Sequence, residues 1–223
     1  MYLFALSVFG SQRRWPALVA ATAYMYAPYL LTNLYVRGAI AELGAQAWLP
    51  WVFWGTRRLL TAERPSQYVV VVALSIGGLA VTHNITLLFA PVVLGCYVLL
   101  LWWRTGRSAA RLGWMALAIA AAVGISAFFW LPLMAERRYL AETAYRTTAT
   151  ALLMHSWTWR TFVNTSVVFE LNGFVPFRLG LVQLVLALTG IIVAGRETPN
   201  GCFSSSWPCS LASASASGLF LSG

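Results

Sequence analysis

The stretch that decides the fold spans residues 28–50 and reads PYLLTNLYVRGAIAELGAQAWLP. It consists of two apolar runs separated by a turn that carries one arginine and one glutamate, Arg37 and Glu42. The whole chain is 60% hydrophobic and only 9% charged. Because charged groups are costly at the edge of a hydrocarbon layer, this pair needs a functional or structural explanation. The stretch predicts two membrane helices joined at a polar turn.

The composition of the whole chain indicates an integral membrane protein. Its 223 residues include 11 tryptophans, and the mean hydropathy is +0.72. A soluble domain of this length would need far more charge on its surface. All 15 basic residues are arginine and all 6 acidic residues are glutamate. Although the net charge of +9 could suggest nucleic acid, the arginines fall between apolar segments rather than on one face, so we expect membrane lipids as partners and no nucleic acid.

Apolar segments recur along the chain and predict an all-α transmembrane helix bundle of about six or seven spans. The first begins directly at Met1 without a basic leader and, at about 1.5 Å per residue, is too short to cross a core of about 30 Å. We therefore expect a helix whose beginning is missing. Pro28 should kink the second span, and Gly77–Gly78 should allow close packing in the fourth. The predicted spans are 1–10, 16–35, 40–56, 68–82, 85–103, 112–134 and 179–195.

The arginines alternate between the connections of these spans. If the spans simply alternate, nine arginines fall on one side, whereas the short connections on the other side hold only Arg37. By the positive-inside rule we place the arginine clusters in the cytoplasm and predict a multi-pass protein of the inner (plasma) membrane. The long loop 135–177 and the other polar candidates then share the extracytoplasmic face. The clusters lie at 13–14, 57–64, 104–111 and 196.

The chain divides into a transmembrane domain, residues 1–196, and a tail, residues 197–223. The tail holds eight serines, as many as the rest of the chain together, and no arginine. Its low complexity is typical of either a disordered tail or a frameshifted end, and the sequence leaves both interpretations open. The three cysteines have no metal-binding spacing, and Cys96 should be a buried thiol inside a span.

Arg37 and Glu42 form the first candidate site. If a helix begins near Gly38, Glu42 lies in its first turn, where the positive end of the helix dipole favours a carboxylate. Arg37 lies just before that end, and its guanidinium, with free backbone N–H groups nearby, would suit a phosphate or diphosphate. The alternative is a purely structural ion pair, or an arginine that extends toward lipid headgroups.

Two further clusters should lie on the same face. His83 and Asn84 form a polar turn that would bind a substrate oxygen or take part in acid–base chemistry, or would simply end one helix and begin another. Glu136 and Arg137 follow Trp-Leu-Pro at a span end and would act on substrate or mark an ordinary membrane boundary. Residues 155–160 of the long loop contain two tryptophans that would stack on a sugar or lie at the interface.

Several sequence signatures are absent. The chain has no phosphate-binding glycine loop, no HExxH motif and no cysteine-based metal motif. It also lacks aspartate, the usual carboxylate for holding a metal or deprotonating an acceptor, so only glutamate is available for these roles. The sequence identifies no cofactor, and a divalent metal has no support in it.

These residues together resemble a known family. YVRGAIAE at 35–42, LP at 49–50, THN at 82–84 and WLP at 130–132 with Glu136 resemble bacterial multi-span proteins of the 6-pyruvoyl-tetrahydropterin-synthase-related membrane family. Such proteins are similar to GT-C-type glycosyltransferases, which use a polyprenyl-phosphate sugar donor at the outer face of the membrane. The resemblance implies that Arg37 and His83 contact the donor phosphate and that Glu42 and Glu136 have orienting or acid–base roles.

The resemblance also implies an acidic catalytic residue in a first outer loop, which this chain does not show. The leading hypothesis is therefore a fragment of a GT-C-like glycosyltransferase. Asn84 and Arg137 join Arg37 and His83 as candidate substrate-binding residues, and Glu42 and Glu136 are the candidate catalytic ones. A transporter or lipid flippase is the second hypothesis, although charge is nearly absent from mid-span and no internal repeat is evident. A non-catalytic membrane scaffold is the third.

Overall fold

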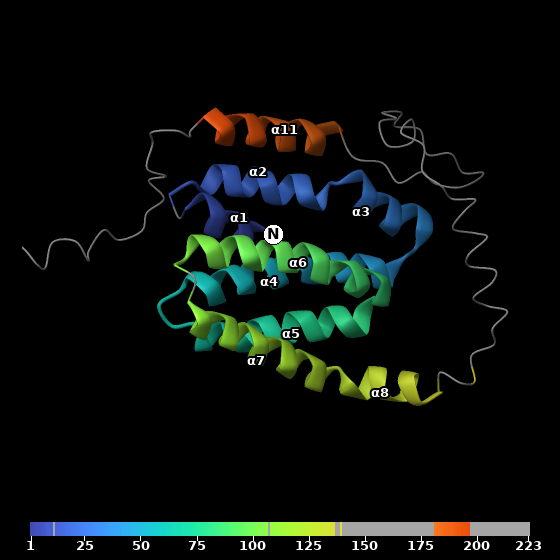
Figure 1. Ribbon diagram of the computed structural model, residues 1–223. Coiled ribbons are helices and arrows are strands. Elements are labelled where there is room, and N and C mark those ends of the chain that lie inside the picture. Colours follow the sequence, from blue (N-terminus) through green and yellow to red (C-terminus); the bar gives the residue numbers. More distant parts are fainter. Residues whose placement is uncertain (11, 107, 137–138, 140–180, 197–223) are drawn as a thin grey trace, which may run out of the picture.

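A computed structural model describes residues 1–10, 12–106, 108–136, 139 and 181–196 of the chain. Within these residues the protein is entirely helical, without a strand, as the all-α prediction requires. Figure 1 shows the helices lying side by side along one common direction. They are α1 (Tyr2–Phe9), α2 (Arg14–Met25), α3 (Pro28–Thr32), the π-helix η1 (Asn33–Arg37), α4 (Ile40–Thr61), α5 (Ser66–Thr82), α6 (Asn84–Arg104), α7 (Ala109–Ile125), α8 (Ala127–Glu136) and α11 (Leu181–Arg196).

The second predicted span is broken at Pro28 rather than kinked. Helix α2 ends at Met25, and α3 begins at Pro28 after an extended residue, Ala27, with φ −62° and ψ 132°. Proline has no backbone N–H and disfavours a helical residue before it, so it suits the first turn of a new helix. Helix α3 then continues into the wider turn of η1, which ends at Gly38.

Two other predicted spans have different bounds. Helix α4 does not stop near residue 56 but runs for 22 residues to Thr61, because arginine is a good helix former and the helix continues through Arg57 and Arg58. The predicted span 112–134 is bent by 63° between α7 and α8. At the bend, the Ser126 hydroxyl donates to the Ala122 carbonyl at 2.8 Å, a side-chain bond that competes with the helix ladder and favours bending.

These breaks reduce the number of helices that could cross a membrane unaided. Within the described part of the chain, only α6 is both long enough and apolar enough, and α7 with α8 becomes a second if the bent pair counts as one span. Helix α5 is apolar but has 17 residues, and α4 carries charge at both ends. The predicted six or seven spans are therefore not confirmed.

Helix α6 carries apolar side chains on nearly all sides. Only 6% of its most apolar window is buried within the protein. Exposed residues include Ile85, Leu88, Phe89 and Val92. An apolar surface of this kind is unfavourable in water but favourable in contact with lipid chains. Cys96, expected to be buried, is exposed on this same helix, because most of the surface of α6 is not covered by other helices. This surface is the clearest structural indication of contact with lipid.

The tightest helix contact joins α4 to α5, and glycine permits it. A Cβ atom added at Gly78 would lie 2.6 Å from the Trp48 ring, and one added at Gly44 would lie 2.8 Å from the Thr82 methyl group. Neighbouring Gly77 instead faces α7, where an added Cβ would be 3.5 Å from the Ala122 carbonyl. Half of the buried apolar residues are alanine, which is typical of helices packed in a membrane. The close packing predicted at Gly77–Gly78 is confirmed.

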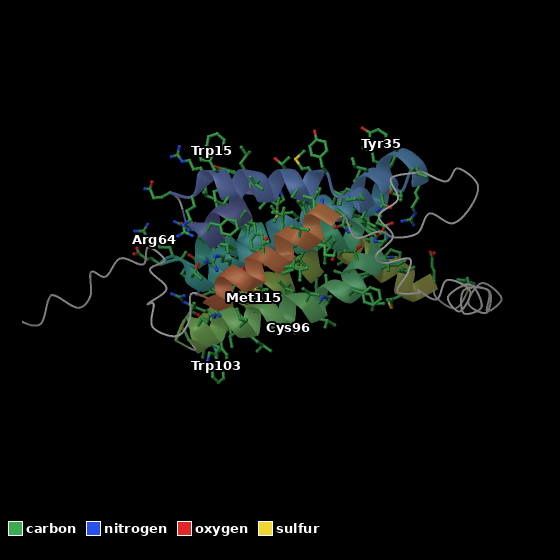
Figure 2. All side chains as sticks on the ribbon, turned by 90° about the horizontal axis from the view of Figure 1, so that it is seen from above. Trp15, Tyr35, Arg64, Cys96, Trp103 and Met115 are labelled. Atoms are coloured by element: carbon green, nitrogen blue, oxygen red, sulfur yellow. The ribbon has the colours of Figure 1, made fainter. Side chains whose placement is uncertain are left out.

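The predicted arginine clusters and polar turns lie at opposite ends of the bundle. In Figure 1 the α1–α2, α4–α5 and α6–α7 connections are at one end, and the η1–α4 and α5–α6 turns are at the other. Figure 2 shows Trp15, Arg64 and Trp103 together at the first end and Tyr35 at the second. We call these the arginine-rich end and the Arg37 end. The candidate site lies at the Arg37 end.

Candidate functional site

The π-helix η1 places the buried side-chain amide of Asn33 in contact with the Arg37 guanidinium. Asn33 is completely buried, and its Oδ1 accepts a hydrogen bond from Arg37 Nη1 at 2.7 Å. The Arg37 side chain is 35% exposed, so one end of it is buried and the rest remains accessible. Both residues come from the same short helix, and their spacing of four residues puts them on neighbouring turns. The buried amide of Asn33 therefore fixes the position of the Arg37 guanidinium.

Glu42 holds the same guanidinium from the other side of the turn. Arg37 Nη1 donates to Glu42 Oε2 at 3.0 Å, and the Glu42 side chain is only 13% exposed. Gly38 adopts the left-handed conformation, with φ 61°, which reverses the chain so that α4 begins two residues later. Glu42 then lies in the first turn of α4, as predicted, where the helix dipole favours its charge.

The backbone N–H groups of this turn are not available for a phosphate. The carbonyl of Asn33 accepts from the N–H of Gly38 and, at 3.0 Å, from the N–H of Ala39. The N–H of Ile40 donates to the Gly38 carbonyl at 2.9 Å. The expectation of free N–H groups beside Arg37 is therefore wrong for these three residues, because the carbonyls of Asn33 and Gly38 accept their hydrogen bonds. These three N–H groups can hold an anion only if they give up those bonds.

One side-chain donor in the cluster is unsatisfied. Asn33 Nδ2 is buried and has no hydrogen-bond partner among the described residues. A buried polar group without a partner costs about 1–3 kcal/mol, so such groups need an explanation. The sequence reasoning did not single out Asn33. The signal was present, however, as a polar residue four positions before Arg37 within an apolar run.

His83 approaches the pair from α5. It has an extended backbone and caps α6, with Nδ1 accepting from the Thr86 N–H at 3.2 Å. The cap explains locally why Thr82-His83-Asn84 forms a turn, since it satisfies a free donor at the start of the helix. With Nδ1 accepting, the proton of the neutral ring lies on Nε2. The ring is near enough to Glu42 for a charge on His83 to stabilise the carboxylate.

The remaining predicted site residues do not join this cluster. Asn84 is the first residue of α6 and is exposed. Glu136 is exposed at the end of α8, which Figure 1 places across the bundle from η1, with α5 and α6 between them. Arg137 and the loop residues 155–160 lie outside the described residues. Arg37, Glu42 and His83 are therefore the predicted residues that the structure brings together, with Asn33 added.

The group has the chemistry of an anion site rather than a metal site. Among the residues that the structure describes, no three histidine, cysteine or acidic side chains gather where they could hold a metal ion. The guanidinium next to Glu42 would also oppose a cation. A guanidinium and an amide N–H both donate hydrogen bonds, and phosphate oxygens accept them.

Helical architecture, a lipid-compatible surface and alanine-rich packing define an all-α membrane protein. The chain belongs to the family described as the 6-pyruvoyl-tetrahydropterin synthase related domain, a membrane protein family, whose profile matches residues 2–217. The match confirms the family resemblance and the membrane class of the protein. Comparisons with curated proteins and with solved structures gave no match.

Proposed function

We propose that this chain is the membrane-embedded part of a GT-C-like glycosyltransferase that moves a sugar from a polyprenyl-phosphate donor at the extracytoplasmic face. The single observation that supports this most strongly is the gathering of Arg37, Glu42 and His83 at one end of an otherwise apolar bundle, opposite the arginine-rich end. By the positive-inside rule, the Arg37 end faces outward, where lipid-linked sugars would meet it.

In this proposal Arg37 binds the donor phosphate. A guanidinium can form two parallel hydrogen bonds to phosphate oxygens and offset the charge that builds up on the leaving phosphate. An acceptor hydroxyl attacks the anomeric carbon, the bond from that carbon to the phosphate oxygen breaks, and polyprenyl phosphate leaves. The hydroxyl proton passes to a carboxylate.

Glu42 is the better candidate for the carboxylate than Glu136. It lies within hydrogen-bond distance of Arg37 and near His83, whereas Glu136 is on a different side of the bundle. Glu136, with Asn84 and Arg137, then remains a candidate for contacts with the acceptor or with the lipid chain. In this scheme Arg37 offsets the negative charge of the phosphate.

The test uses the protein expressed from its complete gene, purified into lipid nanodiscs and supplied with polyprenyl-phosphate sugars. Release of polyprenyl phosphate, followed by mass spectrometry, should fall at least 100-fold in Arg37→Gln and in Glu42→Gln. Arg104→Gln is the matched control, because Arg104 is exposed at the arginine-rich end. Absence of release with every donor tested, or full release by Arg37→Gln, would rule the proposal out.

A lipid flippase or transporter is the second candidate function, and one specific observation favours it. The segment from Arg14 to Arg37 is a discontinuous helix, interrupted before Pro28 and ending in a π-helix, and transporters often build binding sites from such broken helices. Movement of a polyprenyl phosphate across proteoliposomes without sugar transfer would establish it. If Ala substitutions of Arg37, Glu42 and His83 change neither readout, a scaffold role is the better explanation.

A further inference from the structure

We infer that Asn33 is a ligand-contacting residue, whose buried amide donates to an oxygen of the same phosphate that Arg37 binds. This inference deepens the proposed function, on which it rests for the lipid part of the ligand. The recognised chemistry is a phosphate group with several acceptor oxygens, whether it belongs to a lipid or is free in solution.

The first step in the argument is the uneven use of the Asn33 side chain. An asparagine amide offers one acceptor oxygen and an NH₂ group with two donor hydrogens. The oxygen is occupied by Arg37 Nη1 at 2.7 Å, whereas Nδ2 has no partner in the described part of the chain. Because Asn33 is 0% exposed, water at the outer surface does not satisfy this donor. The acceptor oxygen of Asn33 therefore has a partner within the protein, whereas its donor group has none among the described residues.

The second step concerns the partner that Asn33 Nδ2 lacks, and whether that partner must be a hydrogen-bond acceptor and an anion. The unsatisfied group is a donor, and Arg37, which is bonded to the oxygen of the same amide, is a cation that can only donate. Two donors side by side require an acceptor-rich group, and the positive charge of Arg37 selects an anion. Glu42 supplies one oxygen to one nitrogen of Arg37 and has no hydrogen bond to Asn33. A phosphate, with at least three oxygens, can accept from both residues at once.

The third step is a route to the amide. Asn33 is buried, but the five residues that follow it, 34–38, are all exposed, so η1 lies at the surface of the bundle. At Gly38 an added Cβ atom would meet no other atom within 4 Å, so there is open space beside the turn. The inference requires that η1 shift far enough for a phosphate from this space to reach Asn33 Nδ2 beside Arg37.

Phosphate binding would also change the partner of Arg37. The oxygen of Glu42 gives up its place on Nη1 to a phosphate oxygen, while Asn33 Oδ1 keeps the guanidinium in position. His83 lies near Glu42 and would stabilise the displaced carboxylate in its doubly protonated form, in which Nδ1 no longer accepts from the Thr86 N–H. The ion pair of Arg37 and Glu42 is then the arrangement of the site before phosphate binds, and the hydrogen bond from Arg37 to Asn33 is kept when it binds.

The test measures binding of geranylgeranyl monophosphate and of inorganic phosphate to the complete protein in phosphatidylcholine nanodiscs. Asn33→Asp keeps the shape and the acceptor for Arg37 but replaces the donor with a second acceptor. We expect its affinity for phosphate to fall at least ten-fold. Gln67→Glu, the same change from amide to carboxylate at an exposed position at the start of α5, at the arginine-rich end, should stay within two-fold of the unchanged protein. Unchanged affinity in Asn33→Asp, or no phosphate binding by the unchanged protein, would overturn the inference.

A second measurement does not depend on that variant folding. The chain has five asparagines, so selective ¹⁵N labelling gives few side-chain amide signals, which substitutions of the other four assign. The Asn33 NH₂ proton signal should move downfield when the phosphate ligand saturates the protein, as an amide proton does when it gains a hydrogen bond to an anion. A signal that stays in place at saturation would also overturn the inference.

The ligand source and the proposed function are separated by the same experiments. Binding of both probes with equal sensitivity to Asn33→Asp supports recognition of the phosphate alone, and binding of the isoprenyl phosphate only supports a lipid ligand. Loss of binding in Asn33→Asp without any sugar transfer by the complete protein would keep the inference and reject the glycosyltransferase. Sugar transfer with full activity in Asn33→Asp would support the glycosyltransferase and reject the role of Asn33 as a phosphate-contacting residue.

Discussion

The two ends of the bundle use arginine in opposite ways. At the arginine-rich end, Arg57 Nε donates to the Ser7 carbonyl at 2.9 Å, and Arg111 Nη1 donates to the Leu60 carbonyl. At the Arg37 end, the guanidinium is held by a carboxylate and a buried amide instead. The first pair of partners belongs to the backbone and the second to side chains. The arginines of the two ends are thus distinguished by what they bind, although their sequence contexts look alike.

The backbone partners explain what the arginine-rich end does for stability. Ser7 and Leu60 lie in the last turns of α1 and α4, where carbonyls lack helical partners and carry the negative end of the dipole. Arg57 and Arg111 satisfy these groups and tie together helices that are distant in the sequence. Arg58 adds a contact over the Tyr68 ring, 5.5 Å from its centroid. This end needs no ligand to satisfy these arginines.

The largest expected difference between the ends is their accessibility from outside the cell. Gly38 and Gly106 are a matched pair, because both have positive φ and an added Cβ meets nothing within 4 Å at either. In a background without Cys96, Cys202 and Cys209, we expect Gly38→Cys to react with an impermeant thiol reagent on intact cells. Gly106→Cys should react only after the membrane is opened. The opposite pattern would place the candidate site in the cytoplasm.

A smaller effect should follow from loosening the α4–α5 contact, which connects the two ends. Gly78→Ala forces a Cβ into the Trp48 ring at 2.6 Å, and such overpacking typically destabilises by about 1–3 kcal/mol. Gly77→Ala is the control in the same helix, since its Cβ would make ordinary contact at 3.5 Å. Thermal unfolding in detergent should show a lower Tm for Gly78→Ala alone. Equal effects at both positions would contradict the packing described here.

The smallest effect compares the stability contributions of the arginines themselves. Arg111→Gln removes a charged hydrogen bond to a helix end and should lower the free energy of unfolding by about 1.5 kcal/mol. Glu42→Gln removes the partly exposed ion pair, worth at most about 1 kcal/mol, and leaves Arg37 bonded to Asn33. Arg104→Gln, at an exposed position, should change stability by no more than about 0.5 kcal/mol. If Glu42→Gln were the most destabilising of the three, the ion pair of Arg37 and Glu42 would be structural rather than a resting binding site.

Much of the helical organisation follows from the sequence pattern. Each of the seven predicted apolar segments contains helix, since long apolar runs must satisfy their backbone groups internally. The ion pair of Arg37 and Glu42 was also predictable, because Gly38 between them turns the chain back on itself. The break before Pro28 was located correctly, although its outcome, a short α-helix followed by a π-helix, was not.

The features of the candidate site that could not be predicted from the sequence share one cause. Whether Asn33 is buried, and whether its amide is satisfied, depends on which neighbouring helices cover η1. The occupied N–H groups of Gly38 and Ala39 depend on the wide π-turn, which has no simple residue signature. The separation of Glu136 from Arg37 depends on the bend at Ser126 and on how α8 leaves the bundle. Spacing along the chain carries none of this information.

The sequence by itself determined that the chain is helical, that it belongs in a membrane, and that its arginines alternate between connections, because these properties follow from local hydrophobicity and charge. Only the tertiary structure decided which arginines bind backbone carbonyls, that Asn33 lies beneath Arg37 with an unsatisfied donor, and that His83 rather than Glu136 accompanies Glu42. Those outcomes depend on contacts between helices far apart in the chain, and hydrogen bonds form only where packing brings donor and acceptor within reach.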